Sequence, residues 1–276
     1  MPQPNRIIAM LTDFGYRDPY VAAMKGVILS IDPQLTVIDI THEVPNFNVR
    51  EAAFILFNVY RYYPRGTVFL VVVDPGVGST RRAIAIETEN YFFVGPDNGV
   101  LMLAARSDGI VRCVELTNDR FFRKPVSRSF HGRDIFAPCA AWIAKGIDLE
   151  ALGPRIDCSS LTSLDMELDH TVRNGCVELR VLYIDRFGNV ILSQYFDKIS
   201  NAVGLRIGSR ITVRNISKNV ALEGRVCEVF SHARPGELVL YRDSFDLAEL
   251  AVNLGSASKV LNADVGDLIE ICLVER

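Results

Sequence analysis

Residues 68–82 read V-F-L-V-V-V-D-P-G-V-G-S-T-R-R, an apolar run that leads Asp74 into a Pro-Gly turn. A continuous apolar run of this length is typical of a strand buried on both faces of a parallel sheet. In α/β folds, ligands bind outside the carboxyl ends of such strands. We therefore expect Asp74, and Arg81 seven residues after it, to lie at the edge of the sheet where a site would form.

Strand and helix patterns alternate around this stretch in the first half of the chain. Strands are predicted at residues 6–12, 35–41 and 67–73, with a pair of strands at 82–88 and 91–97. Helices are predicted at residues 19–31, 49–62 and 135–146, and a helix start at 99–106. This alternation predicts an α/β fold with a mainly parallel sheet and helices on both faces.

The pattern changes after about residue 150. Residues 152–165 have no clear period and are interpreted as a linker. Short strands separated by turns follow, at residues 176–184, 209–214, 224–230, 237–241 and 267–274. Such spacing is typical of a small antiparallel β-barrel or sandwich. We predict an N-terminal α/β domain over residues 1–165 and a C-terminal antiparallel β-barrel domain over residues 166–276.

Composition argues against several classes of function. The net charge is −3 and no basic run occurs, so neither nucleic acid nor an anionic membrane surface is an expected partner. The N-terminus lacks the apolar core of a signal peptide, and no apolar stretch reaches the roughly 18–20 residues of a membrane span, so we expect a cytoplasmic protein. The six cysteines are scattered without a C-x-x-C pair, which predicts free thiols and no metal site.

Known phosphate-binding and nucleophile motifs are missing from the sequence. Neither G-x-G-x-x-G at the start of a helix nor G-x-x-x-x-G-K-[ST] occurs, and the G-V-G-S of residues 76–79 fits an ordinary turn. No G-x-S-x-G elbow occurs, which argues against an α/β-hydrolase.

Three side chains are candidates for catalysis: Asp74, Arg81 and His131, the last in the F-H-G-R-D of residues 130–134. An acid, a fixed cation and an imidazole can together orient and polarise a water molecule. The residue types alone leave a plainer interpretation open, in which Asp74 forms a turn, Arg81 is solvated and His131 is half-buried.

Further polar clusters occur at other strand ends. Asp13 follows the first strand and can accept both hydrogen bonds of a ribose diol, or merely form a turn. Asp185 and Asn189, in I-D-R-F-G-N-V, either make a hairpin turn or present an acceptor and an amide to a ligand. The small and polar residues of 241–257 favour a ligand-binding edge over a plain strand.

Six motifs occur in order along nearly the whole chain: T-D-F-G-x-x-D-P-Y-V, I-T-H-E-V-P-x-F-x-V-R-E-A-A, V-V-D-P-G-V-G-S-x-R-R, V-G-P-D-N-G, F-H-G-R-D-I-F-A-P and I-D-R-F-G-N. In these the sequence resembles the S-adenosyl-L-methionine (SAM) hydroxide adenosyltransferases, the adenosine-forming SAM hydrolases, which are relatives of the SAM-dependent fluorinase and chlorinase. The resemblance implies an N-terminal α/β domain and a C-terminal β-barrel. It also implies a homotrimer whose sites lie between the N-domain of one subunit and the C-domain of the next.

The resemblance also implies a reaction and residue roles. Activated water attacks the ribose 5′ carbon of SAM, giving adenosine and L-methionine; SAM is the substrate, and no cofactor or metal is implied. The water-activating residues correspond to Asp74, Arg81 and His131. The substrate-binding residues correspond to Asp13 for the ribose diol, Phe47 beside the ribose and adenine, Phe130 and Gly132 around the nucleophile, Asp185 and Ser244 for the methionine amino group, and Asn189 and Leu254 for adenine.

The resemblance defines two alternatives to hydrolysis. The first is halide transfer to the same carbon, but the halogenating relatives have Tyr at the position of Asp74 and Ser at that of Gly132. They also place an Arg that grips the methionine carboxylate where this chain has Phe245, and the fluorinase has a long insertion before V-G-P-D-N-G. The second alternative is a non-catalytic SAM- or adenosine-binding protein, which would lack the water-activating residues.

Overall fold

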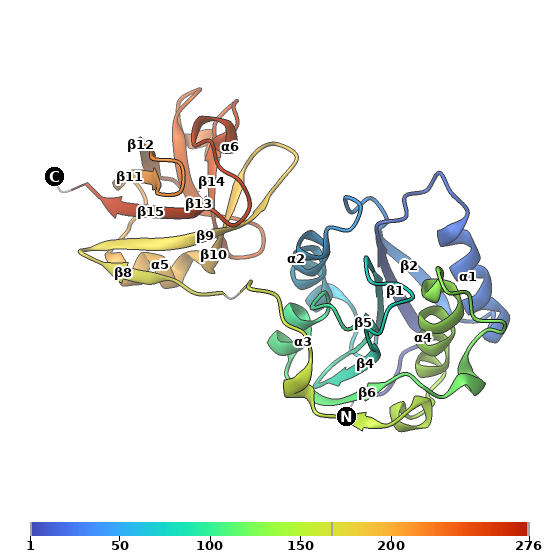
Figure 1. Ribbon diagram of the computed structural model, residues 1–276. Coiled ribbons are helices and arrows are strands. Elements are labelled where there is room, and N and C mark those ends of the chain that lie inside the picture. The colour runs from blue at the N-terminus through green and yellow to red at the C-terminus, as the bar shows by residue number, and fades with distance from the viewer. Residues whose placement is uncertain (1, 167, 275–276) are drawn as a thin grey trace. The chain divides into compact units, whose positions relative to one another are not determined.

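The computed structural model describes residues 2–166 and 168–274. The chain divides into two compact units, Met1–Asp165 and Met166–Arg276. Figure 1 shows helices packed around a sheet in the first unit and a strand-rich second unit.

A seven-stranded sheet forms the centre of the first unit, in the order β2-β1-β3-β5-β4-β6-β7. Its strands are β1 (Ile7–Thr12), β2 (Thr36–Thr41), β3 (Val68–Val72), β4 (Ala83–Thr88), β5 (Phe92–Pro96), β6 (Ile110–Glu115) and β7 (Arg155–Ile156). Strands β2, β1, β3 and β5 are parallel, whereas β4 pairs antiparallel with β5 and β6. The α/β prediction is confirmed, and the sheet is mixed because β4 and β5 form a hairpin.

Helices cover both faces of this sheet, as predicted (Figure 1). One face carries α1 (Tyr20–Ile31) and α4 (Ala137–Ala144), and the other carries α2 (Val49–Val59) and α3 (Met102–Asp108). Helix α4 is apolar on nearly every side, and it packs with Met24 and Ile28 of α1 against Leu70 and Val72 of β3. This packing fixes the carboxyl end of β3, where Asp74 follows, against the start of α4.

The expected linker at 152–165 is wrong as a description of this segment. It begins at the last residue of η4 (Leu149–Leu152) and contains β7 and the short 3-10 helix η5 (Cys158–Ser160), and β7 pairs with β6. A disulfide and hydrogen bonds described below hold it to the first unit. The segment has no sequence period because it makes only short elements.

A barrel forms the second unit, with strands in the order β10-β14-β13-β12-β11-β15-β9-β8, closed by pairing of β10 with β9. The strands are β8 (Thr171–Arg173), β9 (Cys176–Ile184), β10 (Val190–Tyr195), β11 (Arg210–Asn215), β12 (Val220–Val226), β13 (Leu238–Arg242), β14 (Leu247–Val252) and β15 (Leu268–Leu273). Two short helices, α5 (Phe196–Val203) and α6 (Ala257–Val260), accompany them. The predicted β-barrel is confirmed; its pairs are antiparallel except β12 with β13.

The sequence prediction missed three strands of the second unit, β8, β10 and β14, and misplaced a fourth. Residues 247–252, placed within a ligand edge, form the fully buried strand β14, and β10 was not predicted. Strand β12 runs over Val220–Val226 rather than 224–230. In β14 the buried acid Glu249 interrupts the apolar run, so that the strand reads as a polar loop.

Four of the six cysteines form disulfides, so the expectation of free thiols is wrong for them. Cys113 in β6 bonds to Cys158, and Cys176 bonds to Cys272. The first pair forms because β6 and β7 are neighbours, and the second because Cys176 lies opposite Cys272 in the β9–β15 ladder. The sequence separations of 45 and 96 hide these contacts. Cys139 and Cys227 are free and buried.

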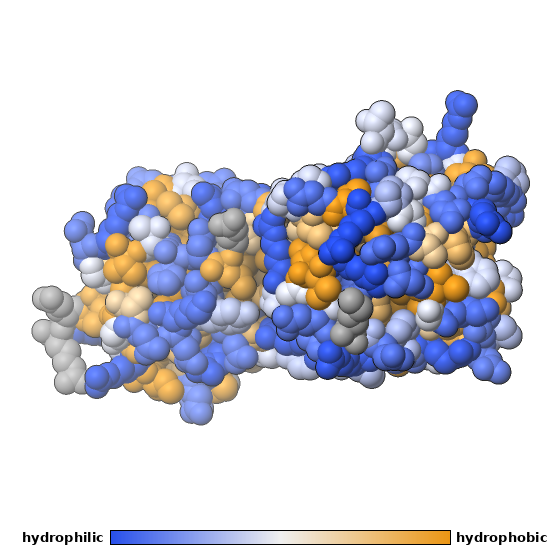
Figure 2. All heavy atoms as spheres, turned by 90° about the horizontal axis from the view of Figure 1, so that it is seen from below, coloured by the Kyte–Doolittle hydropathy of each residue, from blue (hydrophilic) through white to orange (hydrophobic). Residues whose placement is uncertain are grey.

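Apolar side chains on the face shown in Figure 2 stand in separate groups between polar and charged ones. Within residues 2–166 and 168–274, no helix combines the length and the hydrophobicity that crossing a membrane requires.

Candidate functional site

Asp74, Arg81 and His131 come together at the carboxyl end of β3. The Arg81 Nε donates to both oxygens of Asp74 at 3.0 Å, and its terminal NH2 group donates to Asp74 Oδ2 at 2.5 Å. The same NH2 group lies 2.8 Å from His131 Nδ1. The side chains of Arg81 and Asp74 are only 11% and 5% exposed. The three groups thus form one connected, largely desolvated cluster.

The geometry fixes the state of the His131 ring. A guanidinium can only donate hydrogen bonds, so Nδ1 of His131 is the acceptor and the neutral ring carries its proton on Nε2. Burial lowers the pKa of His131, and the positive charge of Arg81 lowers it further. The imidazole is therefore neutral at pH 7, with one lone pair already engaged by Arg81.

The loop of residues 74–82 has features that hold Arg81 in place. Its guanidinium lies 5.1 Å from the ring centre of Phe136, a cation–π contact. A Cβ at Gly76 would lie 3.3 Å from the Arg81 side chain, so the absence of a side chain there leaves room for the arginine stem. Gly78 has φ +78°, and a Cβ there would lie 2.5 Å from the carbonyl oxygen of Arg128, so the loop packs closely on the segment that leads to His131.

His131 immediately precedes a five-residue π-helix, Gly132–Phe136, which continues into α4. Such helices occur often at functional sites. Gly132 is buried, and a Cβ there would lie 3.3 Å from the sulfur of Met24. Phe130 packs edge-on against the rings of Phe14 and Tyr20. Both residues adjoin His131 in the sequence, and their expected place around the nucleophile stays a prediction.

Asp13 follows β1, which is the neighbour of β3 in the sheet. Its Oδ2 accepts a hydrogen bond of 2.8 Å from the backbone N–H of Phe47. Burial raises the pKa of Asp13, and the nearby charge of Asp74 adds to the rise. Phe47 itself has φ +65° and is 67% exposed. Asp13 and Phe47 thus lie on the same edge of the sheet as Asp74.

The loop that carries Asp13 packs on His42, a residue at another strand end for which the sequence leaves open a place in the cleft and favours loop packing. His42 is fully buried, and its Nδ1 lies 2.7 Å from the hydroxyl of Thr12. Its Nε2 lies 3.0 Å from Asp39, which also binds Lys25 at 2.6 Å. The Thr12 hydroxyl in turn accepts from the N–H of Phe14. These contacts hold Thr12 and Phe14, the two sequence neighbours of Asp13, in place.

Asp185 and Asn189 lie in the β9–β10 turn of the second unit. Oδ1 of Asp185 accepts from the backbone N–H groups of Phe187 and Asn189 at 2.9 Å, and Oδ2 accepts from the Asn189 amide at 3.2 Å. These hydrogen bonds are those of a turn, so the interpretation of this segment as a hairpin turn describes its local geometry. A ligand role for the same side chains stays a prediction.

The other candidate residues of the second unit lie in nearby turns. Ser244 and Phe245 stand between β13 and β14, where the Phe245 N–H donates to Asp243. Leu254 follows β14 with φ +56° and is 88% exposed. Its turn adjoins Gly188, because the N–H of Ser258 donates to the Gly188 carbonyl at 2.8 Å.

Glu249 is a candidate that the sequence analysis missed. It is buried in β14 and accepts a hydrogen bond from the hydroxyl of Tyr241. Burial raises the pKa of Glu249 to about 7, and the charges of Asp243 and Asp185 contribute, while Asn189 hydrogen-bonds it. Three carboxyl groups thus gather near the β9–β10 turn. The only sequence signal was an acid inside the run L-A-E-L-A-V.

The predicted residues thus form two groups. Asp13, Phe47, Asp74, Arg81, Phe130, His131 and Gly132 gather at one edge of the first unit, and Asp185, Asn189, Ser244, Phe245 and Leu254 lie in turns of the second. The first group offers a carboxylate, a fixed cation and a neutral imidazole, which suits activation of water. The second contains the carboxyl group of Asp185, with those of Asp243 and Glu249 nearby, which suits a cationic group of a ligand. Among the described residues, one cluster has the spacing of metal ligands, Cys176, Glu270 and Cys272, but the two cysteines are bonded to each other.

Two family models match the chain. The model of the SAM hydroxide adenosyltransferase N-terminal domain matches residues 8–153, and that of the SAM hydroxide adenosyltransferase C-terminal domain matches residues 179–270.

Individual proteins are similar over nearly the whole chain. The (R)-S-adenosyl-L-methionine hydrolase of Salinispora tropica is 39% identical, over 97% of this chain and 98% of its own. A solved structure of an uncharacterized conserved protein from Thermotoga maritima has a TM-score of 0.89 at 42% identity, over 96% of this chain and 99% of its own. A fluorinase of Actinopolyspora mzabensis is 25% identical, over 96% of each chain. The hydrolase is thus considerably more similar to this chain than the fluorinase.

Proposed function

The chain belongs to the SAM hydroxide adenosyltransferase family, and we propose that it hydrolyses S-adenosyl-L-methionine to adenosine and L-methionine. The observation that carries the proposal is the desolvated cluster of Asp74, Arg81 and His131 at the carboxyl end of β3. A protein that only binds SAM has no need of such a cluster.

The chemistry requires a water molecule to become a competent nucleophile. Water has a pKa near 15.7 and is a poor nucleophile at neutral pH. The Arg81 guanidinium stabilises the developing hydroxide, and a carboxylate oxygen of Asp74 keeps a free lone pair to accept its proton. We assign the base role to Asp74 because Nδ1 of His131 is engaged by Arg81. Nε2–H of His131 then orients the water.

The bond changes balance without any further reactant. Oxygen of water attacks the ribose 5′ carbon while the carbon–sulfur bond breaks in line with it. The sulfonium takes the bonding electron pair and leaves as the neutral thioether of methionine. One proton is released through Asp74. Arg81 supplies the positive charge that a metal ion supplies in other hydrolases, so the proposal includes neither a metal nor a cofactor.

Substrate contacts follow the two groups of residues. In the proposal, Asp13 accepts hydrogen bonds from the ribose diol, Phe47 packs beside the ribose and adenine, and Phe130 and Gly132 bound the space for water. Asp185, with Ser244 and Phe245, holds the methionine end, while Asn189 and Leu254 contact adenine. The carboxylates around Asp185 support this, since the methionine end carries an ammonium group.

We also propose a homotrimer in which the first unit of one subunit and the second unit of the next complete each site. The division of the candidate residues between the two units supports this arrangement. So does the exposure of Phe47 and Leu254, two apolar side chains that are 67% and 88% exposed. Such side chains gain from burial in an assembly.

A cytoplasmic location is the remaining part of the proposal. The two disulfides argue against this part of the proposal, because cytosolic proteins outside hyperthermophiles rarely keep disulfides. Alkylation of cell extracts followed by mass spectrometry would show whether Cys113 and Cys158 are bonded in cells.

The residues at two positions argue against halide transfer. The carboxylate of Asp74 repels an anion at the place where the halide would have to sit. Gly132 is packed closely against Met24, so that an added Cβ would lie 3.3 Å from its sulfur and would require a small adjustment of that side chain. Hydrolysis is therefore favoured over halogenation.

The test is chromatography of the products from SAM. The wild-type protein should release adenosine and methionine in equal amounts, also with added chloride or fluoride. Asp74→Asn should keep SAM binding in calorimetry and lose about 10²- to 10⁴-fold in kcat, the usual contribution of a general base. The surface variant Asp119→Asn, which removes an exposed carboxylate of the same unit, should retain full activity.

Two results would overturn the proposal. Binding of SAM by the wild-type protein without adenosine release would indicate a binding protein. A 5′-halo-adenosine product would indicate a halogenase.

A further inference from the structure

The loop of residues 74–82, which carries Asp74 and Arg81, is fastened at both ends to one dipeptide. At its entry, the side-chain amide of Asn98 donates to the carbonyl oxygen of Val73 at 2.8 Å. At its exit, the backbone N–H of Asp97 donates to the carbonyl oxygen of Arg82 at 3.0 Å. Asp97 and Asn98 follow β5, the neighbour of both β3 and β4, so they stand between the two ends of the loop.

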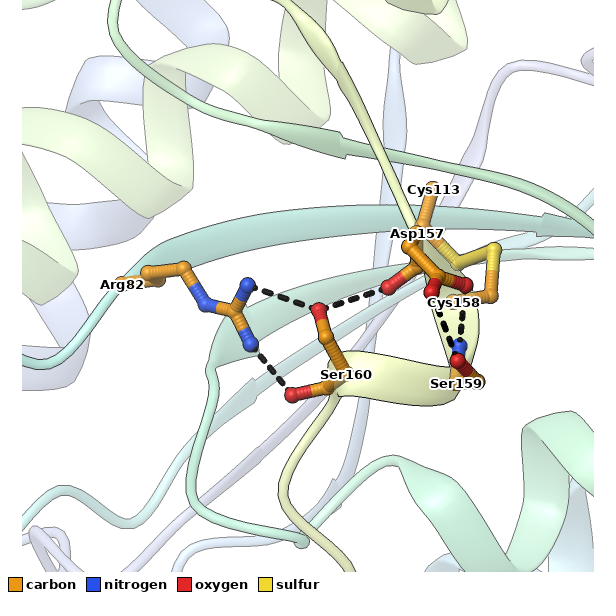
Figure 3. Close-up of a disulfide and its surroundings, with 6 residues drawn as sticks. All are labelled: Arg82, Cys113, Asp157, Cys158, Ser159 and Ser160. Carbon is orange, nitrogen blue, oxygen red and sulfur yellow. Dashed lines mark hydrogen bonds between the residues drawn. A yellow bond between two sulfur atoms is a disulfide. The ribbon is translucent and has the colours of Figure 1, made fainter.

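The Asp97 side chain adds a second attachment at the exit. Its Oδ2 accepts from Arg82 Nε at 2.8 Å, and its Oδ1 accepts from the backbone N–H of Thr162 at 2.8 Å. This carboxylate is only 4% exposed. The other two nitrogens of Arg82 donate to Ser160, one to its hydroxyl at 3.0 Å and one to its carbonyl at 2.7 Å (Figure 3). Every nitrogen of the Arg82 guanidinium is thus engaged.

Ser160 is itself held in place. Its hydroxyl donates to the carbonyl of Asp157 at 2.7 Å, and the carboxylate of Asp157 accepts from the N–H of Ser159 at 2.9 Å. Cys158, in the same short helix, is bonded to Cys113 of β6 (Figure 3). The disulfide therefore fixes the segment that receives Arg82 to the sheet.

We propose that Asp97 and Asn98 are positioning residues for the hydrolysis. We call these two residues, together with Arg82 and Ser160, the clamp. The clamp sets the distance between the two ends of the 74–82 loop. The catalytic role of this loop rests on the proposed function. The clamp touches neither water nor substrate and acts through the placement of Asp74 and Arg81.

The need for a clamp follows from the loop itself. It contains two glycines, Gly76 and Gly78, which give it conformational freedom. Arg81 must keep Asp74 and His131 within hydrogen-bond distance at the same time. Because misplacing a catalytic group by 1 Å can cost about 10²-fold in rate, restraint at both loop ends has a direct effect on turnover.

The test compares variants of the clamp with a control variant that breaks a different ion pair of the same sheet. Asp97→Ala and Asn98→Ala should each lower kcat about 10- to 100-fold while KM for SAM changes little. Asp97→Asn, which keeps the acceptor for Thr162, should recover part of the loss. The control is Glu87→Ala, because buried Glu87 pairs with Arg112 at the far end of β4. Glu87→Ala should lower the melting temperature and leave kcat within about threefold of the wild type, because the contacts of the 74–82 loop are unchanged.

Hydrogen exchange makes the test independent of catalysis. Amides of residues 74–82 should exchange faster in Asp97→Ala, in Asn98→Ala and, to a smaller extent, in Cys158→Ser. They should not do so in Glu87→Ala or in Cys176→Ser, which removes the other disulfide. Unchanged exchange and kcat in both alanine variants, or equal losses in Glu87→Ala, would overturn the clamp. Absence of adenosine release from the wild type would instead overturn the proposed function, while the exchange data would still decide whether the clamp orders the loop.

Discussion

Arg81 contacts both other members of the candidate catalytic trio. It binds both oxygens of Asp74 and the Nδ1 of His131, and it stacks on Phe136. Only a planar, donor-only guanidinium makes these contacts together, so lysine is no conservative replacement here. The residues of the trio were predictable as candidates because each stands in a short polar motif, Asp74 after β3, Arg81 before β4 and His131 before the helical segment that starts at Gly132. The direction of the hydrogen bond to His131 was not predictable, because it depends on contacts between distant parts of the chain.

A prediction at this scale concerns the titration of His131. Burial and the charge of Arg81 lower the pKa of this ring below its usual value of 6.5. Nuclear magnetic resonance of the imidazole should therefore give a midpoint below 6.5 in the wild type. In Arg81→Gln the midpoint should rise, because one of the two causes is removed. The lowered pKa also makes the stability depend on pH. Because His131 binds a proton less readily in the folded than in the unfolded protein, its contribution to the free energy of unfolding is complete above pH 6.5 and is lost as the pH falls towards the folded-state pKa.

A midpoint of His131 above 6.5 in the wild type, or one that does not respond to Arg81→Gln, would contradict the hydrogen-bond direction described above.

At the scale of elements, close approach between two loops places the catalytic groups. Gly78 has φ +78°, and its Cα passes so near the Arg128 carbonyl that a Cβ would lie 2.5 Å from the oxygen. We predict that Gly78→Ala separates the 74–82 loop from the segment that carries His131. Activity should fall about tenfold or more, because the Arg81–His131 contact lengthens. Kinetics and melting temperature of the variant provide the measurement.

Gly146 offers the control for this substitution. It also has positive φ, +97°, but no atom would lie within 4 Å of an added Cβ. Gly146→Ala should cost about 1 kcal/mol in stability from backbone strain alone, with kcat unchanged. If both alanine variants lose activity equally, strain rather than the close approach is responsible.

Elements with a clear period were predictable, and those defined by long-range contacts were not. The buried run before Asp74 forms β3 as expected, because a continuous apolar stretch has few alternatives in this fold. Strand β14 was missed because Glu249, whose pKa burial raises to about 7 and which accepts a hydrogen bond from Tyr241, interrupts its apolar pattern. The segment 152–165 resembles a linker in sequence because the contacts that hold it, the disulfide to Cys113 and the hydrogen bonds from Arg82, come from residues distant in sequence.

At the scale of the whole molecule, the candidate residues divide between the two units. The proposed trimer predicts complementation between subunits. Asp74→Ala and Asp185→Ala should each be inactive, and a refolded equimolar mixture should recover about a quarter of the wild-type sites, because one random neighbour pair in four combines two intact halves. Adenosine release measures the recovery, and mass photometry measures the oligomer.

A mixture prepared without subunit exchange should stay inactive and is the control for this experiment. If the exchanged mixture shows no recovery although mixed trimers form, the site lies within one chain. The division into an α/β unit and a barrel was predictable from the change in pattern near residue 150, whereas the assembly depends on surfaces that no sequence period reveals.

The two disulfides have a consequence for the covalent architecture of the chain. Cys113–Cys158 closes a ring inside the first unit, and Cys176–Cys272 closes one inside the second, so neither disulfide joins the two units. The backbone between Cys158 and Cys176 connects them covalently. A single proteolytic nick in this tether yields two fragments, each internally cross-linked, that separate on a denaturing gel without any reductant. Disulfide formation therefore holds each unit together after a cut within its own ring, but it does not hold the two units together after a cut between Cys158 and Cys176.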